Sequence, residues 1–541
     1  MKCQYYYFLV SSLIFSELAW GQTAGKAIQF SPMEPPLHLS GTFGELRTNH
    51  FHAGVDLRTG EEIGKPIYAV QGGFVSRIKI SPVGYGLALY IDHPTGHTTV
   101  YAHLEAYHGA IAEWVFQAQS KTHSWALDTL LSPEALPIEG GERVATSGNS
   151  GGSAGPHLHF EVRDTETEHA LNPLEQGLRT EDRIPPTLRA VHFLDASGRR
   201  KKYTSGQQDT ISVISPVGIA LDVYDKQFST GPTTGVFRLE QHTQRDHFAY
   251  SFSRFSFDDG RACNATMDYP YSVSHGTRLY RMFRQPFHPG PLFESVPRGH
   301  DGRLVLDSGT YTKVVWRVWD GHQQQDTAGM VLYCAKTLPY IPPKPDSGDS
   351  LSEGTLGSVR WAPNTFYRKT KVTLNANSSG MLQAEWSGPV HLPVSVAIPL
   401  PDSHGIQKNR ALVWTTASGK KQWFSPQLSG KMGIIFVKEP GAASWQTDHF
   451  PPVLSGFTSW RTRLNPGSRL YFTATDVGLG IASYGAWLND SLWIPVAYDA
   501  KYKRMWVDIP KALSSGSHTL QIYVIDGAGQ KAHFLHSFNT L

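Results

Sequence analysis

The sequence predicts a mostly β protein, in which an N-terminal antiparallel β-sheet domain with a helical insertion is followed by β-sandwich modules. Many short segments alternate polar and apolar residues, which is the period of a half-buried strand. Turn-forming residues are abundant, with 51 Gly and 35 Pro among 541 residues, and only 18% of the residues are charged. Such a composition is typical of β-rich, turn-rich proteins. No helical pattern of convincing length appears after residue 180.

Three predicted strands near the N-terminus each carry histidine on a polar face. They are Phe51–Leu57, Thr99–Leu104 and Gly155–Val162, and in each the polar and apolar residues alternate. Strands with histidine on one face can converge on a single site, which is the outline of a metal centre. The alternation groups His52 with Gly54 and Asp56, Thr99 with Tyr101 and His103, and His157 with His159 and Glu161.

The residue types favour zinc. Two imidazoles and one carboxylate are a common catalytic zinc set, which leaves a fourth position open for water. His52 and Asp56 are four residues apart, roughly 13 Å along an extended strand. Both can reach one ion only if the backbone bends between them, and Gly54 allows a bulge or a close approach there. The pair His157 and His159 provides one ligand and one neighbouring imidazole.

These residues resemble the signature of the lysostaphin-type zinc metallopeptidases, which are peptidoglycan endopeptidases with an H-x-G-x-D motif followed much later by H-x-H. The resemblance covers roughly residues 40–178, a specific match because five separated positions and their contexts agree. It implies that His52, Asp56 and His159 bind zinc. It also implies that His103 and His157 are catalytic imidazoles, one activating water and the other stabilising the oxyanion, and it leaves open which does which.

Other polar features of this region are interpreted as structural. Glu161 shares the polar face, but the helical H-E-x-x-H motif that supplies a glutamate base is absent, so Glu161 is interpreted as a strand or ligand-supporting residue. The glycine-rich segment 147–156 lacks the lysine of a phosphate-binding loop. His50 is the least secure of the remaining histidines because it shares the face of His52. The others interpreted as structural are His38, His93, His97, His108, His123 and His169.

Residues 1–21 are predicted to be a cleaved signal peptide. Lys2 precedes an apolar run from about Tyr5 through Phe15, and small residues stand at Ala19 and Gly21. No other stretch is apolar enough to span a membrane, so we expect an exported protein of the periplasm or cell envelope, or a secreted one. Export allows a disulfide between Cys263 and Cys334. The net charge of +3 argues against nucleic-acid binding.

The predicted domains are a zinc metallopeptidase domain at 22–180, a β-sandwich module at 184–340, a linker at 341–354, a β-rich module at 355–448 and a further module at 450–541. Within the first, Ala110–Trp125 has apolar residues at helical spacing and predicts a helical insertion beside the cleft. Pro-Pro pairs at 185–186 and 451–452 open two segments that end alike, which indicates a weak internal repeat. The two repeated segments resemble bacterial immunoglobulin-like domains.

Aspartates close equivalent predicted strands of this repeat. Asp225 and Asp476 follow early strands, and Asp320 and Asp526 stand in Asp-Gly pairs after late ones. Calcium binding is one interpretation, but no EF-hand spacing is present. Because Asp-Gly is turn chemistry, these residues are interpreted as turn and cap residues.

The sequence therefore predicts an exported zinc metalloendopeptidase that hydrolyses peptide bonds in peptidoglycan stem peptides or cross-links. Zinc-activated water would attack the carbonyl, with His103 and His157 assisting. The C-terminal β modules are expected to position the enzyme on the wall or on an envelope protein. A non-enzymatic regulator or scaffold that binds the wall or partner hydrolases is the alternative, and the intact ligand set His52, Asp56 and His159 argues against it.

Overall fold

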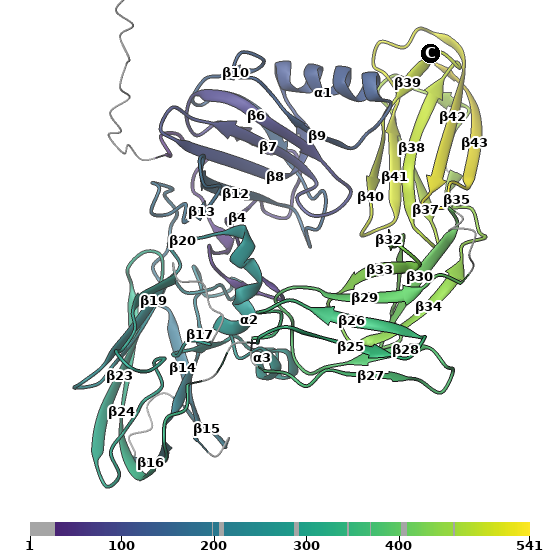
Figure 1. The fold of residues 1–541 in the computed structure, drawn as a ribbon. Helices are drawn as coiled ribbons and strands as arrows, with labels where there is room; N and C mark the ends of the chain where they lie inside the picture. Colours follow the sequence, from purple (N-terminus) through teal and green to yellow (C-terminus); the bar gives the residue numbers. More distant parts are fainter. Residues whose placement is uncertain are drawn as a thin grey trace, which may run out of the picture.

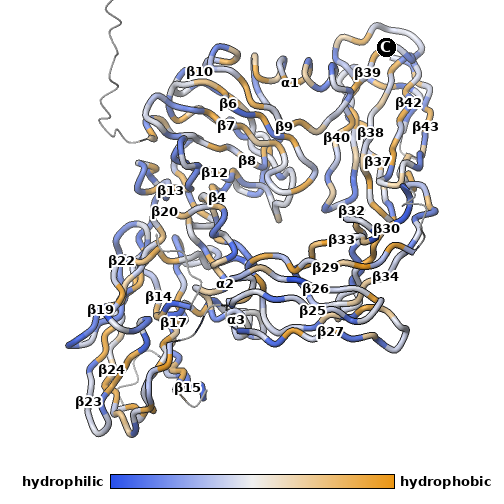
Figure 2. Tube along the Cα trace, in the orientation of Figure 1, coloured by the Kyte–Doolittle hydropathy of each residue, from blue (hydrophilic) through white to orange (hydrophobic). Residues whose placement is uncertain are grey.

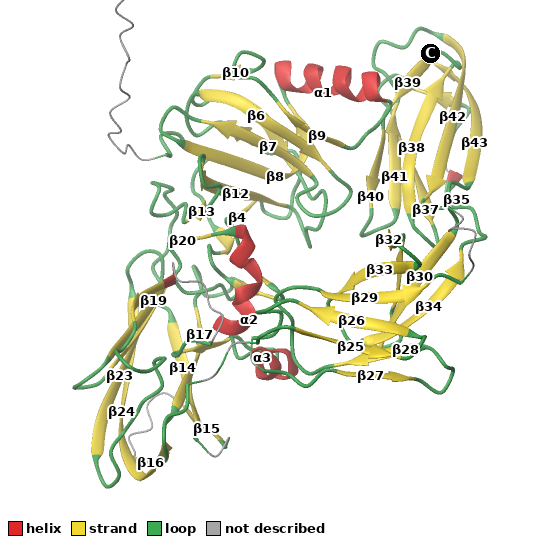
Figure 3. Cartoon of the chain, viewed as in Figure 1, coloured by secondary structure: helices red, strands yellow, loops and turns green. Residues whose placement is uncertain are grey.

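Strands dominate the chain, as predicted, and the helices are few (Figure 3). The computed structural model describes residues 27–540 except 197–198, 205–209, 286–291, 343, 345, 368, 402–407 and 458–459. The predicted signal peptide, 1–21, lies outside the described residues. Apolar and polar residues alternate along many strands (Figure 2), so each sheet can bury one face. None of the helices in the described part of the chain has the length and apolar character of a membrane-spanning segment.

The N-terminal domain is built on a twelve-stranded sheet in which every pair is antiparallel. Its central order is β1-β4-β12-β8-β7-β6-β10, so β12 lies between β4 and β8. A two-stranded hairpin, β2 (Leu46–Arg47) with β3 (His50–Phe51), leads into β4. The strands of the large sheet are β1 (Leu39–Gly41), β4 (Val55–Arg58), β5 (Pro66–Tyr68), β6 (Gly73–Ile80), β7 (Leu87–Asp92), β8 (His97–Tyr107), β9 (Leu127–Leu130), β10 (Pro137–Ile138), β11 (Arg143–Ser147), β12 (His157–Asp164), β13 (Ala170–Leu171) and β20 (Arg254–Phe255).

The helical insertion is present as α1 (Gly109–Thr122), directly after β8. Ile111 and Val115 are buried, and Trp114 and Ala118 pack against the same core, so the predicted apolar stripe is the face that the helix buries. The helix ends at His123, whose left-handed conformation (φ 48°) returns the chain toward β9.

The second module, after residue 184, contains a four-stranded and a six-stranded sheet. Its short helices are η1 (Phe257–Ala262), α2 (Cys263–Thr266) and α3 (Tyr269–His275). The four-stranded sheet has the order β15-β14-β17-β21, with β14 (Thr187–Leu194), β15 (Arg200–Thr204), β17 (Gly218–Tyr224) and β21 (Leu279–Arg281). The six-stranded sheet has the order β16-β24-β23-β18-β19-β22, with β16 (Thr210–Ser215), β18 (Arg238–His242), β19 (His247–Ser251), β22 (Phe293–Ser295), β23 (Tyr311–Trp319) and β24 (Gln325–Thr337).

The third module begins earlier than predicted. The segment 341–354, predicted to be a linker, contains a strand, β25 (Asp349–Glu353), at the edge of a five-stranded sheet. Leu351, which packs against the core of the module, is its one apolar side chain, and all five side chains are partly or fully exposed, so no hydrophobic pattern marks the strand. One sheet comprises β25, β26 (Gly357–Trp361), β29 (Val394–Pro399), β33 (Met432–Val437) and β32 (Gln427–Ser429), and the other β27 (Thr373–Ala376), β28 (Leu382–Glu385), β34 (Gly441–Thr447), β30 (Arg410–Thr416) and β31 (Lys421–Phe424).

The last module repeats the pairing scheme of the second. Hairpin β42–β43 corresponds to β23–β24, and the parallel pair β36–β43 corresponds to β16–β24. The strands are β35 (Val453–Ser455), β37 (Arg469–Thr475), β41 (Arg504–Asp508) and β40 (Val496–Asp499) in one sheet, and β36 (Arg463–Leu464), β43 (Lys531–Thr540), β42 (Gly516–Asp526), β38 (Ile481–Leu488) and β39 (Leu492–Ile494) in the other.

The chain curves so that its last module lies against the N-terminal domain beside α1 (Figure 1). The Arg469 guanidinium pairs with Glu105 at 2.7 Å, and Lys501 Nζ donates to the Ser153 carbonyl at 2.9 Å. The second module holds the other side, where Arg278 pairs with Glu45 at 2.7 Å. The loops around the predicted site are therefore held from two directions.

The two cysteines in the described part of the chain do not pair. Cys263 lies in α2 and Cys334 in β24, and both are buried free thiols. The disulfide that export would permit is absent because the two residues are buried at different places in the second module.

Candidate metal centre

The backbone bends between His52 and Asp56, as the four-residue spacing requires. Strand β3 ends at Phe51 and β4 begins at Val55, so His52 and Gly54 lie in the break. A Cβ on Gly54 would lie 2.3 Å from the Phe160 carbonyl oxygen of β12. Glycine is therefore needed where this bend approaches the neighbouring strand.

Cross-strand pairing brings the second half of the motif beside the first. His159 of β12 pairs with Asp56 of β4 on one side and with Ala102 of β8 on the other. Directly opposed residues share a face, so His159 and Asp56 lie together. The opposite face of β12 carries Leu158, Phe160 and Val162, all fully buried, as the alternation predicts.

Strand β8 departs from the predicted alternation. Thr99 and Tyr101 do not share the site face with His103, because Tyr101 is paired with Phe160 and contacts its ring on the core side. His103 reaches the site by a backbone irregularity instead, with a left-handed φ of 58°. This conformation resets the side-chain direction after Ala102, as in a bulge.

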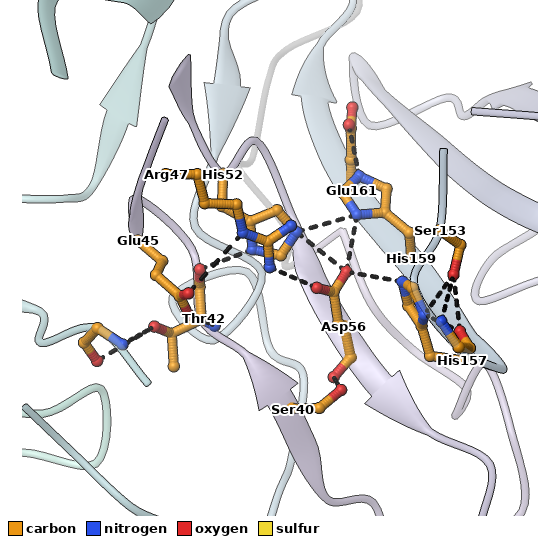
Figure 4. A network of polar contacts seen from close by, with 12 residues as sticks. Ser40, Thr42, Glu45, Arg47, His52, Asp56, Ser153, His157, His159 and Glu161 are labelled. Carbon is orange, nitrogen blue, oxygen red and sulfur yellow. Dashed lines mark hydrogen bonds and ion pairs between the residues drawn. The ribbon is translucent and has the colours of Figure 1, made fainter. Parts of the chain in front are cut away.

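Three ligand-type atoms converge in the buried centre of this face (Figure 4). His52 Nε2 lies 3.0 Å from Asp56 Oδ1 and 3.0 Å from His159 Nδ1, and His159 Nδ1 lies 2.9 Å from Asp56 Oδ1. All three residues are buried. Atoms this close can share one ion at the ligand distances of about 2.0–2.2 Å that zinc takes with imidazole and carboxylate.

The outer ring nitrogens of the two histidines are already engaged. His52 Nδ1 lies 2.8 Å from the Thr42 carbonyl oxygen, and His159 Nε2 lies 2.8 Å from Glu161 Oε1. These oxygens accept hydrogen bonds only, so the outer nitrogens carry the protons of the neutral rings. The inner nitrogens then present lone pairs to each other and to a carboxylate oxygen, an arrangement that is favourable only around a cation. The donor set therefore fits a metal ion.

A family comparison agrees with this geometry. The model of peptidase family M23 matches residues 50–120, which include His52, Asp56 and His103. The N-terminal domain belongs to peptidase family M23. His157 and His159 lie beyond the matched residues, and β12 carries them to the same site.

Individual relatives match about a quarter of the chain. An uncharacterized metalloprotease from Haemophilus influenzae is 30% identical over 160 residues, which are 28% of this chain and 28% of that protein. The DD-carboxypeptidase/endopeptidase Mpg of Neisseria meningitidis is 32% identical over 135 residues, 25% of each chain. The chain thus spans about a quarter of the length of these curated relatives. Among solved structures, the catalytic domain of the prophage-encoded M23 protein EnpA from Enterococcus faecalis is 22% identical and covers 27% of this chain and 95% of its own, with a TM-score of 0.20.

Glu161 supports His159 in the M23 domain, which is one of the two interpretations that the sequence left open. Arg163 donates to Glu161 at 2.7 Å and Tyr85 donates to it at 2.5 Å. Burial alone would raise the pKa of Glu161, but the charge of Arg163 and the bond from His159 outweigh burial and lower this pKa to about 2. Burial lowers the pKa of His159, and the bonds to Asp56 and Glu161 outweigh it and raise the pKa to about 9. The cluster thus attracts positive charge.

His103 and His157 lie beside this cluster. Their ring centroids are 4.9 Å apart, and His157 Nε2 is 3.3 Å from Asp56 Oδ1. Each outer nitrogen faces a backbone carbonyl, His103 Nδ1 at 2.8 Å from Ser150 and His157 Nδ1 at 2.8 Å from Gly155. Nε2 of His103 is thereby left to exchange a proton with a substrate or water. Nε2 of His157 faces Asp56 Oδ1 at the edge of the cluster. Burial, followed by the charges of His159 and His157, lowers the pKa of His103 to about 3.

Sequence reasoning missed several supporting residues. Arg47 of the β2–β3 hairpin pairs with Asp56 at 2.5 Å, and Tyr85 and Thr42 hold Glu161 and His52 as described. No motif marks these positions, because each acts through one hydrogen bond rather than through a ligand pattern. His50, the least secure of the dismissed histidines, is exposed and bonds at Nδ1 to the Thr48 carbonyl, outside the cluster.

Proposed function

We propose that this chain is a zinc-dependent endopeptidase that hydrolyses peptide bonds in peptidoglycan stem peptides or cross-links. The observation that carries the proposal is the convergence of His52, Asp56 and His159, with both outer ring nitrogens engaged. His52, Asp56 and His159 would hold the ion. When bound there, zinc supplies a Lewis acid that polarises a peptide carbonyl and lowers the pKa of water.

The roles of the remaining residues follow from their hydrogen bonds. His103 and His157 each turn Nδ1 toward a backbone carbonyl, so Nε2 of the neutral ring accepts a proton from water. The imidazolium that forms then donates this proton from Nε2 to the developing oxyanion or the leaving amine. Glu161 orients His159, and Thr42 orients His52.

The substrate class and the cellular location are supported by relatedness and by the N-terminal sequence. The Neisseria relative is named a DD-carboxypeptidase/endopeptidase, and it matches a quarter of this chain. Residues 1–21 have the pattern of a signal peptide, which favours export to the periplasm or cell envelope. The β modules after residue 184 would hold the enzyme on the wall or on an envelope protein.

Two ligand variants test the activity. His52→Ala and His159→Ala are each expected to lose bound zinc and to release no peptides from isolated peptidoglycan. His97→Ala, at the far end of β8 from His103, is the matched control and should keep both properties. Circular dichroism and urea unfolding check that the β modules stay folded. Full hydrolysis by both ligand variants would contradict the proposal, and folded, zinc-loaded, inactive wild type would favour a regulator.

A further inference from the structure

Two clusters of three aspartates lie outside the M23 domain, one in each of the repeated modules. The first comprises Asp182, Asp225 and Asp320, and the second Asp448, Asp476 and Asp526. In each cluster, one ligand atom from every residue lies within 4.8 Å of the other two. Neither cluster takes part in the proposed peptidase chemistry.

The two clusters occupy the same positions of the repeat. Asp182 and Asp448 each stand three residues before a Pro-Pro pair, in the segment that enters the module. Asp225 and Asp476 each directly follow a strand, β17 and β37. Asp320 and Asp526 each open the sequence Asp-Gly-x-x-Gln, and each donates its N–H to the carbonyl of that glutamine. The same three-carboxylate arrangement is therefore built twice.

The first cluster contains buried carboxylate oxygens that lack hydrogen-bond partners among the described residues. Asp225 is 2% exposed, and its Oδ1 has no partner. The Asp182 side chain is 1% exposed and its Oδ2 also accepts no hydrogen bond, although His322 Nδ1 lies 3.7 Å away. Asp320 is fully buried, with Oδ1 accepting from the His322 and Gln324 backbones at 2.8 and 2.9 Å.

The second cluster has the same unsatisfied character. Asp526 is 2% exposed and its Oδ2 has no partner in the described chain, while its Oδ1 accepts from the Gln530 N–H at 2.7 Å. Asp476 Oδ1 is likewise unpartnered, and its Oδ2 accepts from Gly478 and Gly480. Asp448 Oδ2 accepts from the Leu479 N–H at 2.8 Å. In each cluster, two of the three aspartates therefore keep one oxygen without a partner among the described residues. The third, Asp320 or Asp448, accepts hydrogen bonds with both oxygens.

Such a cluster is costly without a positive charge. Buried carboxylates that lack partners lose their hydration, and three of them at close range repel one another. Burial, followed by the charges of Asp182 and Asp320, raises the pKa of Asp225 to about 8. Burial, followed by the neighbouring aspartates, also raises the pKa of Asp526. No lysine or arginine pairs with either cluster in the ion pairs of the described residues.

We propose that each aspartate cluster binds a calcium ion. The ligands are all hard oxygens, which calcium prefers and which zinc sites supplement with nitrogen or sulfur. Oxygens on opposite sides of a calcium ion are about 4.6–5.2 Å apart, which fits ligand atoms lying within 4.8 Å. Free carboxylate oxygens of two or more aspartates in each cluster provide its first ligands.

The position of each ion gives it a structural role. Asp182 lies in the connector between the M23 domain and the second module, and Asp448 lies between the third and the last module. The other two aspartates of each cluster belong to the module that follows. A bound ion would therefore attach each connector to the end of the module that follows it. The first ion would fix the orientation of the M23 domain relative to the second module, and the second ion that of the third module relative to the last.

Calcium stoichiometry of the full chain tests the proposal. Equilibrium dialysis with calcium-45, in excess magnesium at pH 7.5, should give about two tightly bound ions per chain, one for each cluster. Asp225→Asn and Asp526→Asn should each lose one ion, and the double variant both. Asp307→Asn and Asp490→Asn, exposed aspartates of the same two modules, should keep two.

Thermal unfolding separates binding from misfolding. Calcium should raise the unfolding midpoint of the wild type, and each variant should lose part of this rise. In chelator, neither variant should unfold earlier than the wild type, because each removes repulsion rather than a needed contact. Two bound ions that persist in the double variant, or a wild type with no calcium bound and no response to chelator, would overturn the proposal.

Discussion

The histidine cluster of the M23 domain and the aspartate clusters of the modules both gather ligand atoms that can hold a cation, but the atoms differ. Each brings three ligand atoms together, within 3.0 Å in the first and within 4.8 Å in the others. All three residues of the first are buried, and two of the three in each of the others are. In the first cluster, the outer nitrogens of His52 and His159 each face a hydrogen-bond acceptor. Their inner nitrogens therefore point toward each other and toward Asp56. In the others, backbone N–H groups hold one carboxylate oxygen and leave another free.

This difference indicates what each kind of cluster can do. Two aimed imidazoles with one carboxylate, and two further imidazoles beside them, suit an ion that takes part in chemistry. All-oxygen clusters at connectors, with no imidazole among their members, suit an ion that holds a structure together.

The largest effect should be the loss of hydrolysis on replacing the proton-transferring histidines, and it should distinguish them from the metal ligands. His103→Ala and His157→Ala should keep one zinc per chain but lose hydrolysis by about 10²–10⁴-fold, the range for a lost general acid or base. Zinc content by elemental analysis and peptide release from peptidoglycan measure the two properties. If either variant loses zinc as His159→Ala does, that histidine is a ligand and this distinction is wrong.

Much of this site could be predicted from the sequence, and its failures have local causes. Alternation placed His157, His159 and Glu161 on one face because β12 is regular, and the His52–Asp56 spacing required the bend that Gly54 permits. Alternation failed at His103, because the left-handed backbone conformation of this residue changes the face to which its side chain points. A local change of backbone conformation such as this one leaves no trace in the alternation of polar and apolar residues along the sequence.

The modules were predicted in outline, and their clusters were not. The repeat of Pro-Pro and Asp-Gly signals indicated two similar modules, and strand pairing shows the same scheme in both. Asp182 and Asp448 lie far in sequence from their cluster partners, so only the fold brings them together. Asp476 and Asp526, interpreted as turn residues, do accept turn N–H bonds, but with one oxygen only. Asp320 accepts hydrogen bonds from its turn with both oxygens.

A smaller effect should come from Glu161, whose carboxylate is hydrogen-bonded to His159. Glu161→Gln should weaken zinc binding by about 10–100-fold, because Glu161 orients His159 and offsets its proton. Competition with a chromophoric zinc chelator measures the change, and the calcium content should stay at two. Glu166→Gln, an exposed residue of the turn after β12, is the control. Unchanged zinc affinity in Glu161→Gln would show that ring orientation is set elsewhere.

A glycine substitution should act on one aspartate cluster alone. A Cβ on Gly478 would lie 1.9 Å from Asp448 Oδ2, so Gly478→Ala must displace this carboxylate. We expect one calcium ion instead of two, a loss of roughly 1–3 kcal/mol in the free energy of unfolding, and unchanged zinc content. Gly260→Ala, which meets no atom within 4 Å, is the control. Retention of both calcium ions would place the second ion elsewhere.

The smallest effect should come from an ionic contact outside both kinds of cluster. Arg469→Ala removes the exposed pair with Glu105 that joins the last module to the M23 domain. Exposed pairs contribute about 0.2–1 kcal/mol, so the urea midpoint should change little and neither metal content should fall. Loss of zinc in this variant would mean that the last module shapes the histidine cluster.

The most direct test of the central claim is digestion of purified peptidoglycan by the mature chain, with released muropeptides identified by mass spectrometry. Cross-linked dimers should be lost, and a chelator should stop this hydrolysis. Added zinc should restore the hydrolysis, and added calcium should not. An unchanged muropeptide profile from folded protein with one bound zinc would contradict the assignment of the histidine cluster as a peptidase centre.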